Sequence, residues 1–154
     1  MKIKSIVFDK LEICGLTSLD LDLIRIWKNN NSQYFFKKNI ISSNDQIKWF
    51  KKYSDTENDF MFIIKFENKK IGTIGIREYE GNWDIYNVIL GEKEFGGKGF
   101  ISEALNLIIE FAINKYNYDI TARVLKSNKN IKWYIENNFQ IIDEKNEYYL
   151  IKKI

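Results

Sequence analysis

The chain of 154 residues contains no histidine and a single cysteine, Cys14. These absences exclude catalytic pairs in which a histidine activates a serine or cysteine, and they exclude zinc sites built from histidine or cysteine. One cysteine cannot form a disulfide within the chain, which fits a reducing compartment. We therefore expect no metal site, and we expect any chemistry to come from tyrosine, carboxylates, hydroxyls, lysine or backbone dipoles.

The sequence also lacks proline, low-complexity stretches and long apolar runs. Its apolar stretches are far shorter than the roughly 18 residues of a membrane span, and residues 1–9 contain no signal-peptide core. We therefore expect a cytoplasmic protein without a membrane partner. Because 45% of the residues are hydrophobic, 16% are aromatic and no linker is visible, residues 1–154 are predicted to form a single globular domain.

A strong excess of one charge is absent as well. The chain has 24 basic and 21 acidic residues, which gives a net charge of +3. The basic residues are interspersed with acidic ones, whereas a protein dedicated to nucleic acid concentrates them in a patch. We expect no nucleic-acid partner.

Apolar periodicity predicts alternating strands and helices. Thr17 or Ser18 caps a first helix that ends among residues 29–31, and Ser43 or Asn44 caps a second. A third helix begins near Ile101, and a fourth covers residues 130–137. Strand candidates are residues 2–8, 11–14, 60–66, 71–76, 83–90, 120–125, 139–143 and 148–151. This order predicts an α/β or α+β sandwich with a mixed sheet.

Three glycines, Gly96, Gly97 and Gly99, separate the strand at residues 83–90 from the third helix. Glycine lets a ligand approach the backbone closely, and the N–H groups at a helix N-terminus attract anions, so this loop is a candidate cradle for phosphate. A Walker A loop would need a glycine at position 92, which is Glu92. The Gly-x-Gly-x-x-Gly dinucleotide fingerprint also fails, because Ser102 stands at its last position.

Residues 91–104, Gly-Glu-Lys-Glu-Phe-Gly-Gly-Lys-Gly-Phe-Ile-Ser-Glu-Ala, resemble the acetyl-coenzyme A loop of the GNAT superfamily of N-acetyltransferases. Gly99 matches the family pattern, whereas Gly96 and Ile101 depart from it. The resemblance implies a mixed, mostly antiparallel sheet of about six to seven strands flanked by about four helices, with acetyl-CoA as co-substrate. It assigns cofactor binding to Val88, Ile89, Leu90, Gly97, Lys98, Gly99, Phe100 and Ile101.

Residues 124–139 resemble the second signature of that family, in which an asparagine after a strand precedes a short helix and a tyrosine. Tyr134 and Phe139 have the family's spacing, and Asn138 replaces its usual glycine. Asn128 is one position closer to Tyr134 than in the family. The resemblance implies that Asn128 contacts the cofactor and that Tyr134 is the acid beside the departing sulfur, a role that suits a phenol because it stays protonated at neutral pH. A purely structural role for Tyr134 stays open.

Transfer of an acetyl group to an amine also needs a donor to the carbonyl oxygen and a route for the amine proton. By resemblance, a backbone N–H of residues 87–90 is the donor. Asp84 is the candidate base or water-positioning group, and proton loss through a water chain is the alternative.

The segment from Arg25 to Tyr53 is aromatic and basic, with Asp45 as its single acidic residue. Its basic residues are Arg25, Lys28, Lys37, Lys38, Lys48, Lys51 and Lys52. Such a field repels polyamines and favours an anionic acceptor. The segment resembles nucleotide-linked amino-sugar N-acetyltransferases, and this implies that Trp27, Lys48 and Trp49 bind the substrate.

The best hypothesis is an acetyl-CoA-dependent N-acetyltransferase that acts on the amino group of a nucleotide-linked amino sugar, an anionic small molecule. Protein N-termini or other small amines are alternative acceptors. A catalytically silent acyl-CoA-binding domain also stays open, because Gly96, Ile101 and Asn128 depart from the family pattern. The resemblance leaves open a homodimer.

Overall fold

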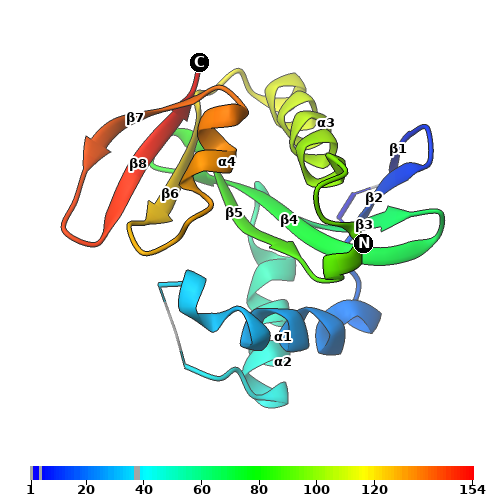
Figure 1. Ribbon diagram of the computed structural model, residues 1–154. Coiled ribbons are helices and arrows are strands. Elements are labelled where there is room, and N and C mark those ends of the chain that lie inside the picture. Colours follow the sequence, from blue (N-terminus) through cyan, green and yellow to red (C-terminus); the bar gives the residue numbers. More distant parts are fainter. Residues whose placement is uncertain (1, 4, 37–38) are drawn as a thin grey trace.

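The computed structural model describes residues 2–3, 5–36 and 39–154, and these residues build one sheet of eight strands (Figure 1). The strands lie in the order β1-β2-β3-β4-β5-β6-β8-β7. Their bounds are Ile6–Phe8 (β1), Leu11–Gly15 (β2), Asp59–Phe66 (β3), Lys69–Tyr79 (β4), Asn82–Leu90 (β5), Ile120–Leu125 (β6), Phe139–Glu144 (β7) and Tyr148–Lys153 (β8). Neighbouring strands are antiparallel except β5 and β6, which are parallel. The predicted fold class is confirmed; the eight strands equal the number of strand candidates in the sequence and exceed the six to seven that the resemblance implied.

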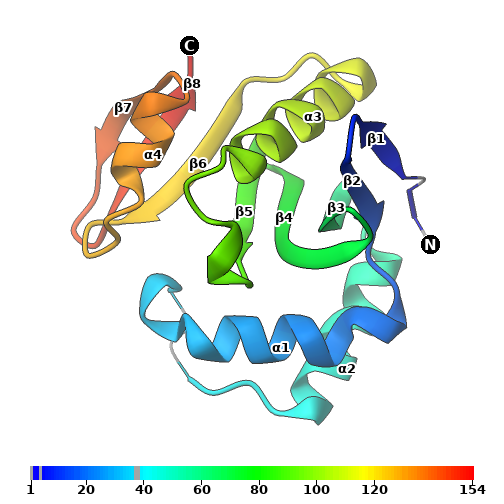
Figure 2. The same cartoon turned by 45° about the vertical axis from the view of Figure 1, so that its right-hand side comes forward.

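In the described parts of the chain, four α-helices cover the sheet. They are Leu21–Asn30 (α1), Ser43–Asp55 (α2), Phe100–Lys115 (α3) and Ile131–Glu136 (α4). Figures 1 and 2 show α1 and α2 on one face of the sheet and α3 and α4 on the other. Both faces of the central strands are therefore buried, which explains why β3 and β4 read as nearly continuous apolar runs.

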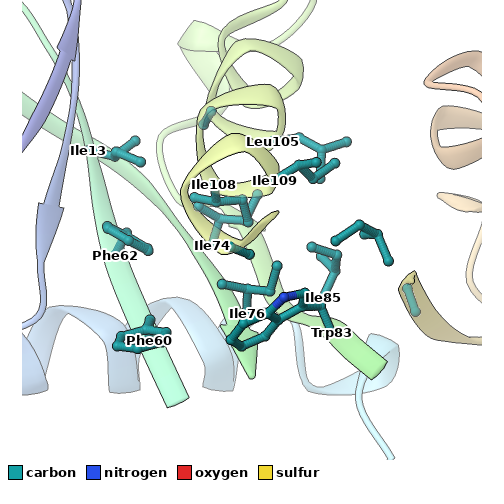
Figure 3. Packing of buried hydrophobic residues seen from close by; sticks show 14 of the residues in the cluster. Ile13, Phe60, Phe62, Ile74, Ile76, Trp83, Ile85, Leu105, Ile108 and Ile109 are labelled. Carbon is teal, nitrogen blue, oxygen red and sulfur yellow. The ribbon is translucent and has the colours of Figure 1, made fainter. Parts of the chain in front are cut away.

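The larger core lies between the sheet and α3. Ala104, Leu105, Ile108, Ile109 and Ala112 recur every three or four residues, so one stripe of the helix is buried. Figure 3 shows this stripe above side chains from β2, β3, β4 and β5. The strand residues labelled there are Ile13, Phe60, Phe62, Ile74, Ile76, Trp83 and Ile85. This core fixes the start of α3 relative to the end of β5.

A second core lies between the sheet and the helices α1 and α2. Ile24 and Trp27 are buried on α1, whereas Leu19 is 88% exposed because it belongs to a short 3₁₀ turn before the helix. Asp20 accepts hydrogen bonds from the backbone N–H and the hydroxyl of Thr17, so the predicted Thr17 cap is confirmed for this turn. The second helix is capped by Ser42, one residue before the predicted position.

Candidate active site

The two halves of the sheet separate at the parallel pair β5 and β6. These strands pair only from Trp83–Ile120 to Ile85–Ala122 within the described chain, although β5 continues to Leu90. Figure 1 shows β6, β8 and β7 diverging from β5 beyond this point. A cavity of about 860 Å³ opens between them, lined by both strands, the glycine loop, α4 and residues that join α1 to α2. All the chemistry described below converges on this cavity.

A β-bulge lies on the wall that β5 contributes to the cavity. Gly75 pairs with Tyr86 and Thr73 pairs with Ile89, so Asn87 and Val88 together oppose one residue of β4. Asn87 has a φ of 51°, and its carbonyl accepts a hydrogen bond of 2.7 Å from the Thr73 hydroxyl. A bulge leaves one residue out of the ladder, which makes a backbone N–H available to a ligand. Asn87, Val88, Ile89 and Leu90 all line the cavity.

The glycine loop ends in a helix N-terminus that faces the same cavity. Gly97 and Gly99 have φ values of 73° and 78°, a left-handed conformation that glycine adopts without strain. Gly99 is the N-cap of α3, and a Cβ added at Gly97 or Gly99 would meet no atom within 4 Å. The first N–H groups of this 16-residue helix have no partner further back in the helix. The loop therefore has the open space and the donors that an anionic group requires.

The neighbours of these glycines divide into two groups. Phe100 and Ile101 line the cavity, as the cofactor assignment requires. Lys98 is exposed and does not line it, and its Nζ lies 5.6 Å from the centre of the Phe95 ring. Lys98 thus lies outside the cavity wall in this structure, and its contact with the cofactor stays a prediction.

Tyr134 lies on α4 and is 7% exposed, with its ring edge-on to Trp133 and Phe139. It lines the cavity, and no group of the described residues forms a hydrogen bond with its hydroxyl. Burial raises the pKa of Tyr134 well above its usual value of 10.0, and the charge of Asp84 adds to this shift. The phenol consequently stays protonated and available to donate.

Asn128 also lines the cavity, in the turn between β6 and α4. Its side-chain oxygen accepts a hydrogen bond of 2.9 Å from the backbone N–H of Asn130, which fixes the start of α4. Ser102 on α3 holds the same helix, because its hydroxyl accepts bonds from Trp133 Nε1 at 3.0 Å and Asn137 Nδ2 at 3.2 Å. Ser102 therefore positions the helix that carries Tyr134.

Asp84 is buried between two arginines. Its Oδ2 accepts hydrogen bonds of 3.1 Å from Arg77 Nε on β4 and of 3.1 Å from Arg123 Nη2 on β6, and its side chain is 3% exposed. Both guanidinium groups thus occupy the same carboxylate oxygen. The geometry does not support Asp84 as the base; it assigns Asp84 to holding the two guanidinium groups.

The cavity wall is predominantly cationic. Its positively charged side chains are Lys28, Lys93, Arg77 and Arg123, and its acidic side chain among the described residues is Asp84. Arg77 and Arg123 were not singled out in the sequence. Their positions in the strands could have identified them. Arg77 alternates with the buried residues Ile74 and Ile76, and Arg123 alternates with the buried residues Ala122 and Val124. Because successive side chains of a strand point to opposite faces of the sheet, both arginines point away from the face that buries these apolar residues.

Of the three predicted substrate residues on α1 and α2, one lines the cavity and two do not. Trp49 lines the cavity and stacks on Tyr53 with ring centres 5.1 Å apart. Trp27 is 4% exposed and packs under Gly91, where an added Cβ would lie 2.0 Å from its ring, so it belongs to the core. Lys48 is exposed and does not line the cavity.

Between α1 and α2, Tyr34, Phe35 and Phe36 line the cavity. Phe36 packs edge-on against Tyr148 of β8, with ring centres 5.3 Å apart. Asn29 accepts a hydrogen bond from the backbone N–H of Ile41 and donates one to its carbonyl, which ties the end of this connection to α1. Lys37 and Lys38, counted above in the basic segment, lie outside the described residues.

Among the described residues, no group of three or more His, Cys, Asp or Glu side chains is arranged to hold a metal ion. None of the described helices combines the length and apolar character needed to cross a membrane.

Comparisons with known proteins agree with this geometry. A family model for the acetyltransferase (GNAT) domain matches residues 10–137. Acetyltransferase PseH of Campylobacter jejuni is 28% identical over 145 residues, covering 88% of this chain and 87% of that protein.

Solved structures share the fold. A domain from Methanocaldococcus jannaschii superposes with a TM-score of 0.80 at 23% identity, covering 94% of this chain and 97% of its own. Spermidine N-acetyltransferase from Vibrio cholerae, in complex with CoA and spermine, gives 0.77 at 21% identity and 94% coverage of both chains. FdhC, described as a nucleotide-linked sugar GNAT, gives 0.77 at 19% identity, covering 99% of this chain and 89% of its own. The match to the family model over most of the chain confirms the resemblance seen in the two signatures: the chain belongs to the GNAT family of acetyltransferases.

Proposed function

We propose that this acetyltransferase transfers the acetyl group of acetyl-CoA to the primary amine of a nucleotide-linked amino sugar. The observation that carries the proposal is the charge of the cavity, whose described walls hold four cations and a single carboxylate already bonded to two of them. Such a wall favours an anionic acceptor and repels a polycationic one.

The glycine loop fits the diphosphate of acetyl-CoA. Gly97 and Gly99 leave open space where side chains would stand, and the α3 N-terminus directs backbone N–H groups to the same space. Val88, Ile89 and Leu90 would hold the cofactor along β5, and Phe100 and Ile101 at the helix start. When bound, acetyl-CoA supplies an acetyl group activated as a thioester. The V. cholerae neighbour was solved with CoA, which supports the same expectation for this chain.

Different residues of the chain would then perform the separate steps of acetyl transfer. A backbone N–H freed by the bulge at Asn87 and Val88 orients and polarises the acetyl carbonyl. Tyr134 holds a proton at its hydroxyl and donates it to the departing sulfur. The amine proton leaves through water, since Asp84 is occupied by arginines. The residues between α1 and α2 exclude bulk solvent from the acceptor side.

Aromatic side chains of the cavity, together with the charged ones, favour a nucleotide-linked acceptor. Trp49, Tyr34, Phe35 and Phe36 line the cavity and offer faces on which a nucleobase can stack. The cations near them suit a diphosphate. FdhC, whose fold this chain shares, is described as acting on a nucleotide-linked sugar. Spermidine, the substrate of another fold neighbour, is disfavoured by the cationic wall.

Several finer expectations stay predictions. They are a single domain over residues 1–154, a cytoplasmic location and a homodimer. Protein N-termini and other small amines are alternative acceptors, and a catalytically silent acyl-CoA-binding domain is the alternative of another class.

An acceptor panel tests the proposal. The enzyme with acetyl-CoA is offered UDP-linked amino sugars, the same free amino sugars, spermidine and a peptide N-terminus, and acetylated products are quantified by mass spectrometry. We expect the nucleotide-linked amines to be acetylated at least tenfold faster than the free sugars and spermidine. Faster acetylation of spermidine or of the peptide contradicts the proposed acceptor, and binding of acetyl-CoA without turnover of any amine favours the silent domain.

A further inference from the structure

We propose that Arg77 and Arg123, held in place by Asp84, form a binding subsite for an oxyanion of the acceptor, separate from the glycine cradle. The ligand chemistry is a phosphate, diphosphate or carboxylate group. The inference rests on the proposed function in that this oxyanion is expected to be the diphosphate that links the sugar to its nucleotide.

The two guanidinium groups are only partly used within the protein. Arg77 bonds Asp84 through Nε and Arg123 bonds it through Nη2, and both reach the same oxygen, Oδ2. Each guanidinium has five N–H donors. No further hydrogen bond joins either group to the described residues, and both residues line the cavity. Several charge-assisted donors are therefore left for a ligand.

The orientation of these donors is restricted from three directions. The Arg77 guanidinium lies over the Tyr86 ring, 4.1 Å from its centre, and that of Arg123 lies over Tyr79 at 4.2 Å. Asp84 lies in the part of β5 that pairs with β6, opposite Thr121. With one face and one edge of each guanidinium occupied, the remaining edges are preorganised for an anion.

The charge count favours an anion as the ligand. Arg77, Arg123 and the nearby Lys2 carry three positive charges against the carboxylates of Asp84 and Asp59, which leaves a net charge of +1. The two arginine side chains are 35% and 24% exposed. A partly desolvated cationic pair is stabilised by an oxyanion that bridges it, and guanidinium groups bind phosphate and carboxylate in a bidentate manner.

The subsite and the cradle lie on different faces of the sheet. Trp83, Ile85 and Ala122 belong to the core beneath α3, whose N-terminus carries the cradle. Asp84 and Arg123 alternate with these residues along β5 and β6 and so point to the face covered by α1 and α2. An anion at Arg77 and Arg123 is thus distinct from an anion bound at Gly97 and Gly99.

Binding of inorganic pyrophosphate tests the subsite directly. The enzyme is first saturated with CoA, so that the cradle is filled, and pyrophosphate is then titrated by calorimetry. We expect saturable binding that weakens at least tenfold in Arg77→Gln and in Arg123→Gln, with CoA affinity unchanged. Lys152→Gln on β8 is the matched control, because this half-buried lysine pairs with Asp119 outside the cavity. The inference is overturned if CoA-saturated enzyme binds no pyrophosphate at millimolar concentration, or if both arginine variants bind it as wild type does.

Asp84→Asn separates positioning from base catalysis. If Asp84 positions the two arginines, Asp84→Asn should raise the KM for an anionic acceptor several-fold. The kcat of this variant and the pH profile of kcat should stay nearly unchanged. A fall in kcat with loss of the acid-side pH dependence, at constant KM, would make Asp84 a base and contradict the assignment.

The subsite and the proposed function fail in different ways. If pyrophosphate binding depends on Arg77 and Arg123 but no nucleotide-linked amine is acetylated, the subsite stands and the proposed acceptor is wrong. If such an amine is acetylated with the same KM by wild type and both arginine variants, the acceptor is right and the subsite is wrong.

Discussion

The two sides of the cavity are built from different parts of the chain. On the side of α3, the groups offered to a ligand are backbone N–H groups from one continuous stretch, the end of β5 and the glycine loop. On the side of α1 and α2, they are charged and aromatic side chains from distant segments, such as Arg77, Arg123 and Trp49. The first side suits a constant cofactor and the second suits a particular acceptor, because side chains can change without disturbing the fold.

Filling the cradle is the change with the largest expected effect. Gly99→Trp should abolish measurable acetyl-CoA binding by calorimetry, because the side chain enters the space that the glycine leaves open. The matched control is Gly81→Trp in the β4–β5 turn, where φ is 80° and an added Cβ also meets nothing within 4 Å. Both variants bear a similar left-handed strain of about 1–2 kcal/mol, so equal loss of binding in both would attribute the effect to strain and not to the cradle.

Removing the Tyr134 hydroxyl should lower kcat roughly 10²-fold to 10³-fold and leave the acetyl-CoA dissociation constant within about twofold. Because its pKa is raised by burial, we also expect no loss of kcat from its ionisation below about pH 10. Tyr53→Phe is the control: the Tyr53 hydroxyl accepts a buried hydrogen bond from the Met61 N–H, so its loss should cost about 1 kcal/mol of unfolding free energy without a large change in kcat. Unchanged turnover in Tyr134→Phe would leave that residue a packing role only.

The position of Trp27 can be tested through its neighbour. Gly91→Ala should lower the free energy of unfolding by about 1–3 kcal/mol, because the new methyl group overlaps the buried Trp27 ring. Urea denaturation of Gly91→Ala and of wild type measures this effect. If Gly91→Ala keeps wild-type stability but has a raised KM for the acceptor, Trp27 contacts the substrate and does not belong to the core.

The smallest expected effect concerns Asp59, which accepts a hydrogen bond from the Tyr86 hydroxyl behind the acceptor side. Burial raises its pKa above the usual value of 3.8, although the Tyr86 bond and the nearby charge of Lys2 lower it. The folded state therefore binds this proton more tightly than the unfolded state, so ionised Asp59 costs stability at neutral pH. The cost should disappear as the pH falls through the raised pKa towards 3.8.

Comparing wild type with Asp59→Asn by urea denaturation at several pH values measures this cost. The unfolding free energy of wild type, relative to that of Asp59→Asn, should rise as the pH falls through the raised pKa of Asp59 towards 3.8. A shift in the opposite direction would show that the folded state favours the ionised carboxylate.

The cofactor side could be predicted from the sequence because its information is local. Gly97 and Gly99 stand between a strand and a helix, and Tyr134 follows the next strand at the family spacing, so contiguous stretches were sufficient. The Thr17 cap and the exact β6 bounds were predicted for the same reason. Fold class and family followed from these stretches and are confirmed.

The acceptor side could not be predicted in the same way. The triad of Arg77, Asp84 and Arg123 forms only when β4, β5 and β6 are placed side by side, and no local pattern marks it. The excess of basic residues between positions 25 and 53 predicted a positively charged cavity. It also drew attention to Lys48, which is exposed to solvent. Trp27 was assigned to the substrate by resemblance, and helical periodicity could not correct this because it does not reveal which neighbour covers an aromatic ring.

The most direct test of the central claim is a thermal-shift titration of the wild-type protein with acetyl-CoA. The account predicts a saturable rise in Tm, since ligand at about 100 times its dissociation constant adds roughly 2.7 kcal/mol, or roughly 5–10 °C for a domain of this size. An unchanged Tm up to millimolar acetyl-CoA would contradict it, because the glycine loop and the α3 N-terminus would then not form a cofactor site.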